Sequence, residues 1–269
     1  MSAPTITFLS DYGLSDDFVG VCHGVIASIC PQARVIDITH GIKRHDVRSG
    51  ALVLRSALGY MPAGVHLAVV DPDVGAERRA VALRVGDDRV LVGPDNGLLS
   101  LAAESAGGIE EAVDIASSRY RLEPVSATFH GRDVFAPVAA HLAAGAPFRE
   151  VGQPCDPDGL VRLELPSSHR EHGALVAHAL YIDRFGNVQL DAGHEALAGT
   201  GLKLGHEVEL ETSSQRCRAH YARTFADVAA GELLVYEDAY RTLAVAVSHG
   251  SAAERLGVAV DDELRIRPR

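Results

Sequence analysis

The chain opens with Thr5-Ile6-Thr7-Phe8-Leu9-Ser10-Asp11-Tyr12-Gly13, a β-branched and aromatic run that ends in a polar turn. Such a run predicts a short buried strand. Residues 17–30 follow with apolar side chains at helical spacing and an aspartate at the start, which predicts a helix. A buried strand that leads through a polar turn into a helix is typical of α/β proteins, so this segment favours that class.

The same alternation continues to about residue 150. The elements that we expect there are strands over 35–38 and 65–70, a hairpin of 80–85 with 89–92, and helices over 47–60, after 97 and after 133. Strands that alternate with helices predict a sandwich of helices on a sheet that is mostly parallel and partly mixed.

After residue 150 the pattern changes to short strands. The polar connection contains Pro154, Pro157 and Pro166. Beyond it, we expect strands over 175–182, 207–211, 216–221, 233–236, 242–247 and 263–266, and one short helix over 252–256. Repeated short strands with glycine turns are typical of a small barrel or sandwich. We therefore predict an N-terminal α/β domain over residues 1–167 and a smaller all-β, barrel-like domain over residues 168–269.

The composition narrows the possible partners and the compartment. The 25 basic and 36 acidic residues give a net charge of −11. A field of that sign repels phosphate backbones and anionic membranes, so we expect neither nucleic acid nor a membrane as partner. The four cysteines form no CxxC pair, which favours reduced thiols. We see no signal peptide and no apolar stretch long enough to span a bilayer, so we expect a cytoplasmic protein.

Several common cofactor and catalytic motifs are absent from the sequence. It contains no GxGxxG, GxxxxGK[ST], HExxH or GxSxG pattern. We therefore find no support for a dinucleotide site, a P-loop, a zincin or a serine hydrolase. The thirteen histidines are scattered without the spacing of a metal site. We expect neither a metal nor another cofactor.

Three segments in the first half carry polar residues at the ends of expected elements. Asp11 follows the first strand, Asp71 follows the strand at 65–70 and precedes Arg78, and His130 precedes a helix. Ligands of open α/β sheets bind beyond the carboxyl ends of the strands. Each residue also has a structural alternative, namely a turn cap for Asp11, a turn start for Asp71, a surface charge for Arg78, and a core histidine for His130. Together they favour an acid–base cluster.

A fourth polar segment lies in the second half. Asp183, Phe185, Gly186 and Asn187 interrupt a strand pattern. An aromatic face with an adjacent amide suits a purine, which stacks and is hydrogen-bonded at its edge. The structural alternative is a β-turn built on Gly186 and Asn187.

Seven short segments resemble, in order, those of the S-adenosyl-L-methionine (SAM) hydroxide adenosyltransferases. These enzymes are also called adenosine-forming SAM hydrolases and are related to the fluorinases and chlorinases. The segments are Ser10-Asp11-Tyr12-Gly13, Phe18-Val19-Gly20-Val21, Asp37-Ile38-Thr39-His40, Val70-Asp71-Pro72 with Arg78-Arg79, Gly93-Pro94-Asp95-Asn96-Gly97, Thr128-Phe129-His130-Gly131-Arg132-Asp133 and Asp183-Arg184-Phe185-Gly186-Asn187.

The resemblance implies a function and a set of site residues. Water would attack C5′ of the ribose of SAM and release adenosine and L-methionine. The resemblance also suggests the R sulfonium epimer of SAM as a substrate. The implied roles are catalysis by Asp71, Arg78 and His130, ribose binding by Asp11, contacts with the methionine amine and the adenine by Asp183, Phe185 and Asn187, and backbone contacts with adenine near Val247. The resemblance also implies a homotrimer, with the substrate between the N-terminal domain of one subunit and the C-terminal domain of a neighbour.

Some residues depart from the family pattern. Asp73 stands where the family usually has glycine, and Ala239, Tyr240 and Ala244 stand where many relatives have serine-rich and glutamate-bearing sequence. Gly131 stands where halogenating relatives have serine, which favours the hydrolases. The alternatives are a halide adenosyltransferase, a protein that binds SAM or adenosine without turnover, and a metal-dependent hydrolase.

Overall fold

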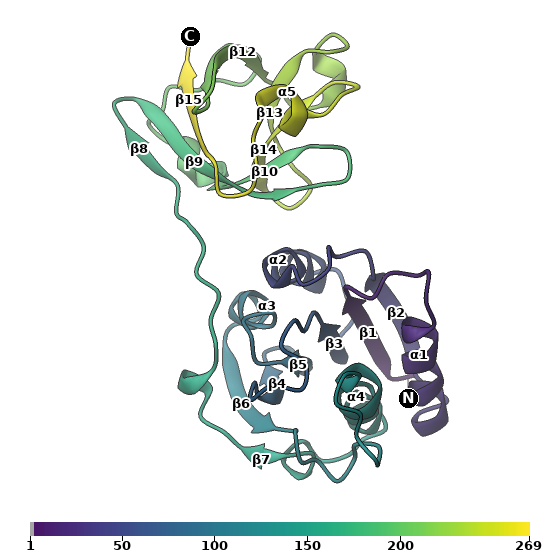
Figure 1. Ribbon diagram of the computed structural model, residues 1–269. Helices are drawn as coiled ribbons and strands as arrows, with labels where there is room; N and C mark the ends of the chain where they lie inside the picture. Colours follow the sequence, from purple (N-terminus) through teal and green to yellow (C-terminus); the bar gives the residue numbers. More distant parts are fainter. Residues whose placement is uncertain (1–2) are drawn as a thin grey trace. The chain divides into compact units, whose positions relative to one another are not determined.

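The computed structural model describes residues 3–269 and divides the chain into two compact units, Met1–Leu163 and Glu164–Arg269. The predicted boundary between the two domains lies after residue 167, and residues 164–167 form no helix or strand. Within residues 3–269, no helix has both the length and the apolar composition that crossing a membrane requires. The N-terminal unit contains most of the helices, and the C-terminal unit consists mainly of strands (Figure 1).

The N-terminal unit is built on a mixed sheet with the strand order β2-β1-β3-β5-β4-β6-β7. The strands are β1 (Thr5–Ser10), β2 (Arg34–Thr39), β3 (Val65–Val69), β4 (Ala80–Val85), β5 (Arg89–Pro94), β6 (Ile109–Asp114) and β7 (Gln153–Pro154). β2, β1, β3 and β5 pair in parallel, whereas β4 lies antiparallel between β5 and β6. The predicted mixed sheet and the β4–β5 hairpin are confirmed.

Helices cover both faces of this sheet (Figure 1). The helices are α1 (Phe18–Ile29), α2 (Val47–Leu58), α3 (Ser100–Ser105) and α4 (Ala136–Ala143), with short helical turns η1 (Gly131–Phe135), η2 (Phe148–Glu150) and η3 (Pro157–Gly159). Side chains alternate across a strand. Phe8 of β1 therefore joins the core under α1 and α4, while Leu9 joins the core under α2 and α3.

The C-terminal unit is a closed β-barrel. Its strands are β8 (His169–Glu171), β9 (Ala174–Ile182), β10 (Val188–Gly193), β11 (Glu207–Glu211), β12 (Arg216–Tyr221), β13 (Leu233–Glu237), β14 (Thr242–Val247) and β15 (Glu263–Pro268). The barrel closes because β10 pairs with both β14 and β9, and β8 adds to the outside of β9. The helical segments are η4 (His194–Leu197), η5 (Phe225–Asp227) and α5 (Ala252–Leu256). The predicted all-β class of this half is confirmed.

The order of strands in the first sheet determines where a ligand can bind. β1 pairs with β2 on one side and with β3 on the other, so the chain reverses its direction of winding at β1. Ser10 and Val69, near the carboxyl ends of β1 and β3, lie opposite each other in the register. Ligands of open α/β sheets bind at such a switch point. Asp11 and Asp71 follow these two neighbouring strand ends.

Candidate functional site

The three predicted catalytic side chains form one connected group at this sheet edge. Nε of Arg78 donates to Oδ1 of Asp71 at 2.8 Å, and its NH2 group donates to Oδ2 of the same carboxylate. The NH2 group also lies 3.0 Å from Nδ1 of His130. The Arg78 and Asp71 side chains are only 8% and 6% exposed. The guanidinium therefore joins a buried carboxylate to an imidazole that comes from a distant part of the sequence.

One hydrogen bond and one close backbone contact position the segments that carry Asp71, Arg78 and His130. The Nδ2 of Asn96 donates to the carbonyl of Val70 at 2.9 Å, which holds the chain just before Asp71. Gly75 adopts φ +84°, and a Cβ there would lie 2.5 Å from the carbonyl oxygen of Ala127. Only glycine allows this approach without strain. The loop that carries Arg78 therefore packs against the segment that precedes His130.

His130 immediately precedes a π-helical turn, η1, which continues into α4. Such turns are rare and are often found at functional sites. Asp133 does not cap this helix, because His130 holds the N-cap position. Instead the buried Asp133 carboxylate accepts from the backbone N–H of Ser126 at 2.7 Å and pairs with Arg132. Asp133 thus fixes the loop on which His130 is presented.

The environment of His130 favours the neutral imidazole. Burial lowers its pKa from the ordinary 6.5, and the nearby Arg78 guanidinium lowers it further, although Asp71 and a backbone hydrogen bond with Ser126 act in the opposite direction. A guanidinium can only donate, so Nδ1 of His130 accepts and the ring proton of the neutral form lies on Nε2. The site therefore holds an uncharged imidazole beside an ion pair.

The two adjacent arginines have different partners. Nε of Arg79 donates to Asp95 at 2.8 Å, and its NH2 group donates to the carbonyl of Gly159. Those contacts tie the end of β5 to the segment that follows β7. Arg79 therefore has a structural role, whereas Arg78 alone of the pair contacts Asp71 and His130.

Asp11 lies at the end of β1, where its Oδ2 accepts from the backbone N–H of His45 at 2.9 Å. The residue is only partly buried. A carboxylate oxygen offers more than one lone pair, so Asp11 retains capacity to accept from a further hydroxyl.

Tyr12 belongs to this site but had no role in the sequence analysis. Burial raises the pKa of its hydroxyl well above 10.0, with smaller contributions from Cys22, Asp11 and Asp71. Its hydroxyl occupies the space that a side chain at position 131 would fill, because a Cβ on Gly131 would overlap it. Tyr12 and Gly131 lie far apart in the sequence, so no local pattern pointed to this contact.

Three of the predicted substrate-binding residues, Asp183, Phe185 and Asn187, lie on one turn after β9. Oδ1 of Asp183 accepts from the backbone N–H groups of Phe185 and Asn187 at 2.8 and 2.9 Å, and Oδ2 accepts from Nδ2 of Asn187 at 2.8 Å. The turn that was the structural alternative is thus present. It leaves the Phe185 ring 66% exposed.

Val247 is the last residue of β14 and is almost fully buried in the core of the barrel. Its carbonyl accepts from the N–H of Gly250 at 3.1 Å. The buried side chain leaves only backbone atoms of this segment for the predicted contact with adenine.

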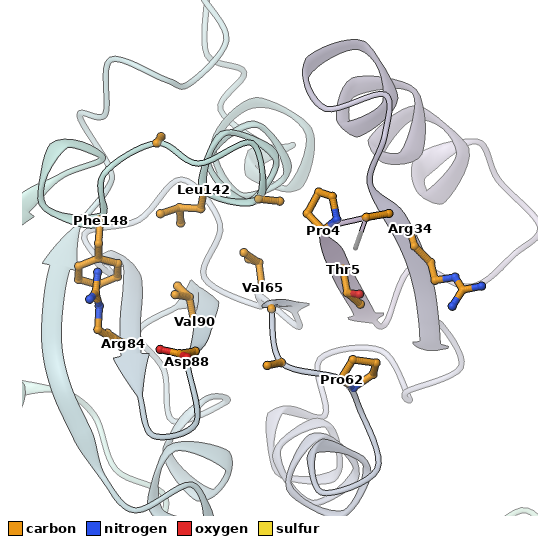
Figure 2. Close-up of a pocket in the computed structure, with 15 residues that line it drawn as sticks. Pro4, Thr5, Arg34, Pro62, Val65, Arg84, Asp88, Val90, Leu142 and Phe148 are labelled. Carbon is orange, nitrogen blue, oxygen red and sulfur yellow. The ribbon is translucent and has the colours of Figure 1, made fainter. Parts of the chain in front are cut away.

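A cavity of about 740 Å³ lies elsewhere in the N-terminal unit. Figure 2 shows Thr5, Val65 and Val90 lining it, together with Leu142 and Phe148. These three strand residues stand at the amino ends of β1, β3 and β5. The cavity is therefore at the edge of the sheet opposite to Asp11 and Asp71. It does not include any of the predicted site residues.

The chain is similar to known proteins over almost its whole length. Residues 6–152 match the family described as SAM hydroxide adenosyltransferase N-terminal domain, and residues 177–265 match the corresponding C-terminal domain. An (R)-S-adenosyl-L-methionine hydrolase from Salinispora tropica is 51% identical, over 98% of this chain and 97% of the relative. A fluorinase from an Actinoplanes species is more distant, at 31% identity over 77% of each chain. A crystal structure of an uncharacterized conserved protein from Thermotoga maritima superposes with a TM-score of 0.91 at 36% identity, covering 97% of this chain and 99% of the other.

Proposed function

The chain belongs to the SAM hydroxide adenosyltransferase family, and from this premise we propose that it hydrolyses S-adenosyl-L-methionine to adenosine and L-methionine. The observation that carries the proposal is the connected group of Asp71, Arg78 and His130 beside the switch point of the sheet. The name of the Salinispora tropica relative supports the R sulfonium epimer as the substrate.

In the proposed reaction the oxygen of water forms a bond with C5′ as the bond between C5′ and sulfur breaks. The bonding electron pair moves to sulfur, which leaves as the neutral thioether of methionine, so no acid needs to protonate the leaving group. The water oxygen must lie in line behind C5′ and must lose a proton. Positioning of this kind supplies up to about 7–11 kcal/mol in the best model systems, and a general base adds about 10²–10⁴-fold.

We assign the proton transfer to Asp71. In the arrangement described above, Nδ1 of His130 accepts from Arg78, so the ring has no free lone pair for a water molecule. The Asp71 carboxylate accepts from Arg78 and keeps further lone pairs. His130 then acts as a positioning residue that holds the guanidinium, and Arg78 holds the carboxylate. His130 accepts the proton only where Arg78 moves away from it.

The remaining predicted residues would hold the two ends of the substrate. Asp11 would accept from the ribose hydroxyls. In the C-terminal unit, the exposed ring of Phe185 offers a face for the adenine, and Asn187 offers an amide beside it. Asp183 would meet the methionine amine, and the backbone near Val247 would meet the edge of the adenine.

We further propose that the working enzyme is a homotrimer, with each site shared between neighbours. The support is that the reactive group and the exposed aromatic ring belong to different units of the chain. Mixing two inactive variants tests this. Asp71→Asn supplies an intact C-terminal unit, and Phe185→Ala supplies an intact N-terminal unit. Co-refolded hybrids should regain activity if neighbours share the site, while a site within one subunit would leave the mixture inactive.

The reaction itself is tested by incubating the protein with each purified SAM epimer in ¹⁸O-labelled water. Adenosine labelled at the 5′ oxygen is the expected product, together with unlabelled methionine. Parallel incubations with chloride and fluoride would reveal a halide adenosyltransferase through a 5′-halogenated nucleoside. Tight binding of the nucleoside without formation of methionine would instead indicate a binding protein.

The free thiols Cys22, Cys30, Cys155 and Cys217 support a reducing compartment, and we propose that the protein acts in the cytoplasm. Fractionation of the source cells with an antibody against this chain tests the location. Recovery in the soluble intracellular fraction is expected, and recovery outside the cell would contradict it.

A further inference from the structure

A second group of polar side chains lies on the N-terminal unit, outside the proposed reaction. His23 comes from α1, Asp37 from β2, and His40 directly follows β2. The Nε2 atoms of His23 and His40 lie 2.9 and 3.1 Å from Oδ1 of Asp37. One ligand atom from each of the three residues lies within 4.8 Å of the others. Asp37 and His40 belong to a segment that carried the family resemblance, yet the proposed reaction gives them no role.

His40 is the member of this group that needs an explanation. Its side chain is 2% exposed, and its Nδ1 lies 2.8 Å from Oγ of Ser10. Its Nε2 is buried and has no hydrogen-bond partner among the described residues, although it lies 3.1 Å from Oδ1 of Asp37. Buried polar atoms are almost always satisfied, so an unsatisfied nitrogen suggests an absent ion or water. The Asp37 oxygen beside this nitrogen also lies 2.9 Å from Nε2 of His23.

We propose that His23, Asp37 and His40 bind a divalent transition-metal ion of the Zn²⁺ class. Two imidazoles and a carboxylate form a ligand set that suits zinc and its neighbours rather than Mg²⁺ or Ca²⁺, which prefer oxygen ligands. Ligand atoms about 2.0–2.2 Å from a tetrahedral zinc ion lie roughly 3.3 Å apart. The two distances from Oδ1 of Asp37, 2.9 and 3.1 Å, are close to this separation. The ion would satisfy Nε2 of His40.

The surroundings agree with a bound ion. The Ser10 hydroxyl at Nδ1 of His40 is the kind of partner that orients a metal-bound histidine. The His23 and Asp37 side chains are 35% and 40% exposed, so water can complete the coordination. The ion would join α1 to the end of β2 and, through Ser10, to the end of β1. Its role is structural, and the proposal does not depend on the hydrolase activity.

Zinc binding to the full-length protein tests the proposal. After treatment with a chelator and dialysis, the protein is titrated with ZnCl₂ in a calorimeter, and CoCl₂ is used to record the visible absorption of a tetrahedral site. The variants are His23→Ala and Asp37→Asn, whose side chains are partly exposed and whose folding is checked by circular dichroism. The matched control is His194→Ala, because His194 also pairs with a carboxylate, at 3.0 Å from Glu237, but does not belong to this group.

One zinc ion per chain is expected for the wild type and for His194→Ala. Each of the other two variants should bind at least about 10-fold more weakly and lose the cobalt absorption. A 100-fold excess of MgCl₂ should not compete. Saturating zinc should raise the thermal midpoint of the wild type but not that of His23→Ala. The proposal is overturned if the wild type binds no zinc, or if His23→Ala and Asp37→Asn bind it as the wild type does; the carboxylate would then simply bridge two imidazoles.

Discussion

Breaking the buried pair of Asp71 and Arg78 from one side only should cost more stability than removing both charges. In Arg78→Met, the Asp71 carboxylate stays in a site where its side chain is 6% exposed, without the two donors that it now has. Removing one partner of a buried ion pair typically costs about 3–5 kcal/mol, because an unpaired charge remains. The double variant Asp71→Asn/Arg78→Met leaves no charge behind. It should therefore be more stable than Arg78→Met by about 2 kcal/mol or more.

Turnover should respond differently from stability. Arg78→Met, Asp71→Asn and the double variant each break the connection that runs through Arg78 to His130, so all three should lose about 10²–10⁴-fold in kcat. Arg79→Met is the matched control at the neighbouring position. It loses the pairing with Asp95 and should be destabilised, yet it keeps Arg78 and should retain turnover within about 10-fold.

Stability is measured by urea unfolding followed by circular dichroism, and turnover by adenosine release. If Arg78→Met is as stable as the double variant, the unpaired Asp71 carboxylate does not carry the expected cost. The catalytic role of the Asp71–Arg78–His130 group is contradicted if any of the three variants has a kcat within tenfold of the wild type, or if Arg79→Met is as inactive as Arg78→Met.

Three other changes have expected outcomes. The pKa of His130 is depressed, so its ring becomes half protonated only at a pH below 6.5. As the pH is lowered, kcat/KM should therefore stay constant past pH 6.5 and fall only when the protonated ring repels Arg78. A fall in kcat/KM with its midpoint at or above pH 6.5 contradicts this. Gly131→Ser should lower the free energy of unfolding, measured in urea, by about 1–3 kcal/mol because the new side chain overlaps the Tyr12 hydroxyl. Adding Tyr12→Phe to this variant should recover part of the lost stability. A Gly131→Ser variant as stable as the wild type argues against the contact. Burial raises the pKa of Cys22 to about 12, so iodoacetamide should label it only after unfolding, and rapid labelling of the folded protein would show that the thiol is accessible.

The fold could be predicted wherever the apolar pattern of the sequence was continuous. β3 reads as an unbroken apolar run because both of its faces are buried, and the expected strand over 65–70 matches it closely. β10 was not predicted, although its buried residues alternate with Gln189 and Asp191 as in a half-buried strand, because it follows directly on the polar turn at 183–187. β10 pairs with both β9 and β14, so the strand that closes the barrel is one that the sequence analysis did not predict.

The candidate site could be predicted only in part. Asp11 and Asp71 were predictable as neighbours, because carboxyl ends of parallel strands meet at one edge of a sheet. Only the family resemblance separated Arg78 from Arg79, since the two residues are adjacent and differ only in the partners that the fold gives them. The overlap of Tyr12 with position 131 and the grouping of His23 with His40 arise from packing between distant segments, which no spacing along the chain records.

The balance of charge in the site follows from these contacts and bears on the proposed reaction. The sulfonium is cationic in the substrate and becomes a neutral thioether, so strong negative charge beside it would stabilise the substrate more than the transition state and slow the reaction. Arg78 neutralises Asp71, and the depressed pKa of His130 keeps the imidazole uncharged, so among the site residues of the N-terminal unit Asp11 supplies the residual negative charge. That charge attracts the substrate, while the paired carboxylate remains able to accept a proton. Arg78 therefore both orients Asp71 and limits how tightly the ground state is held.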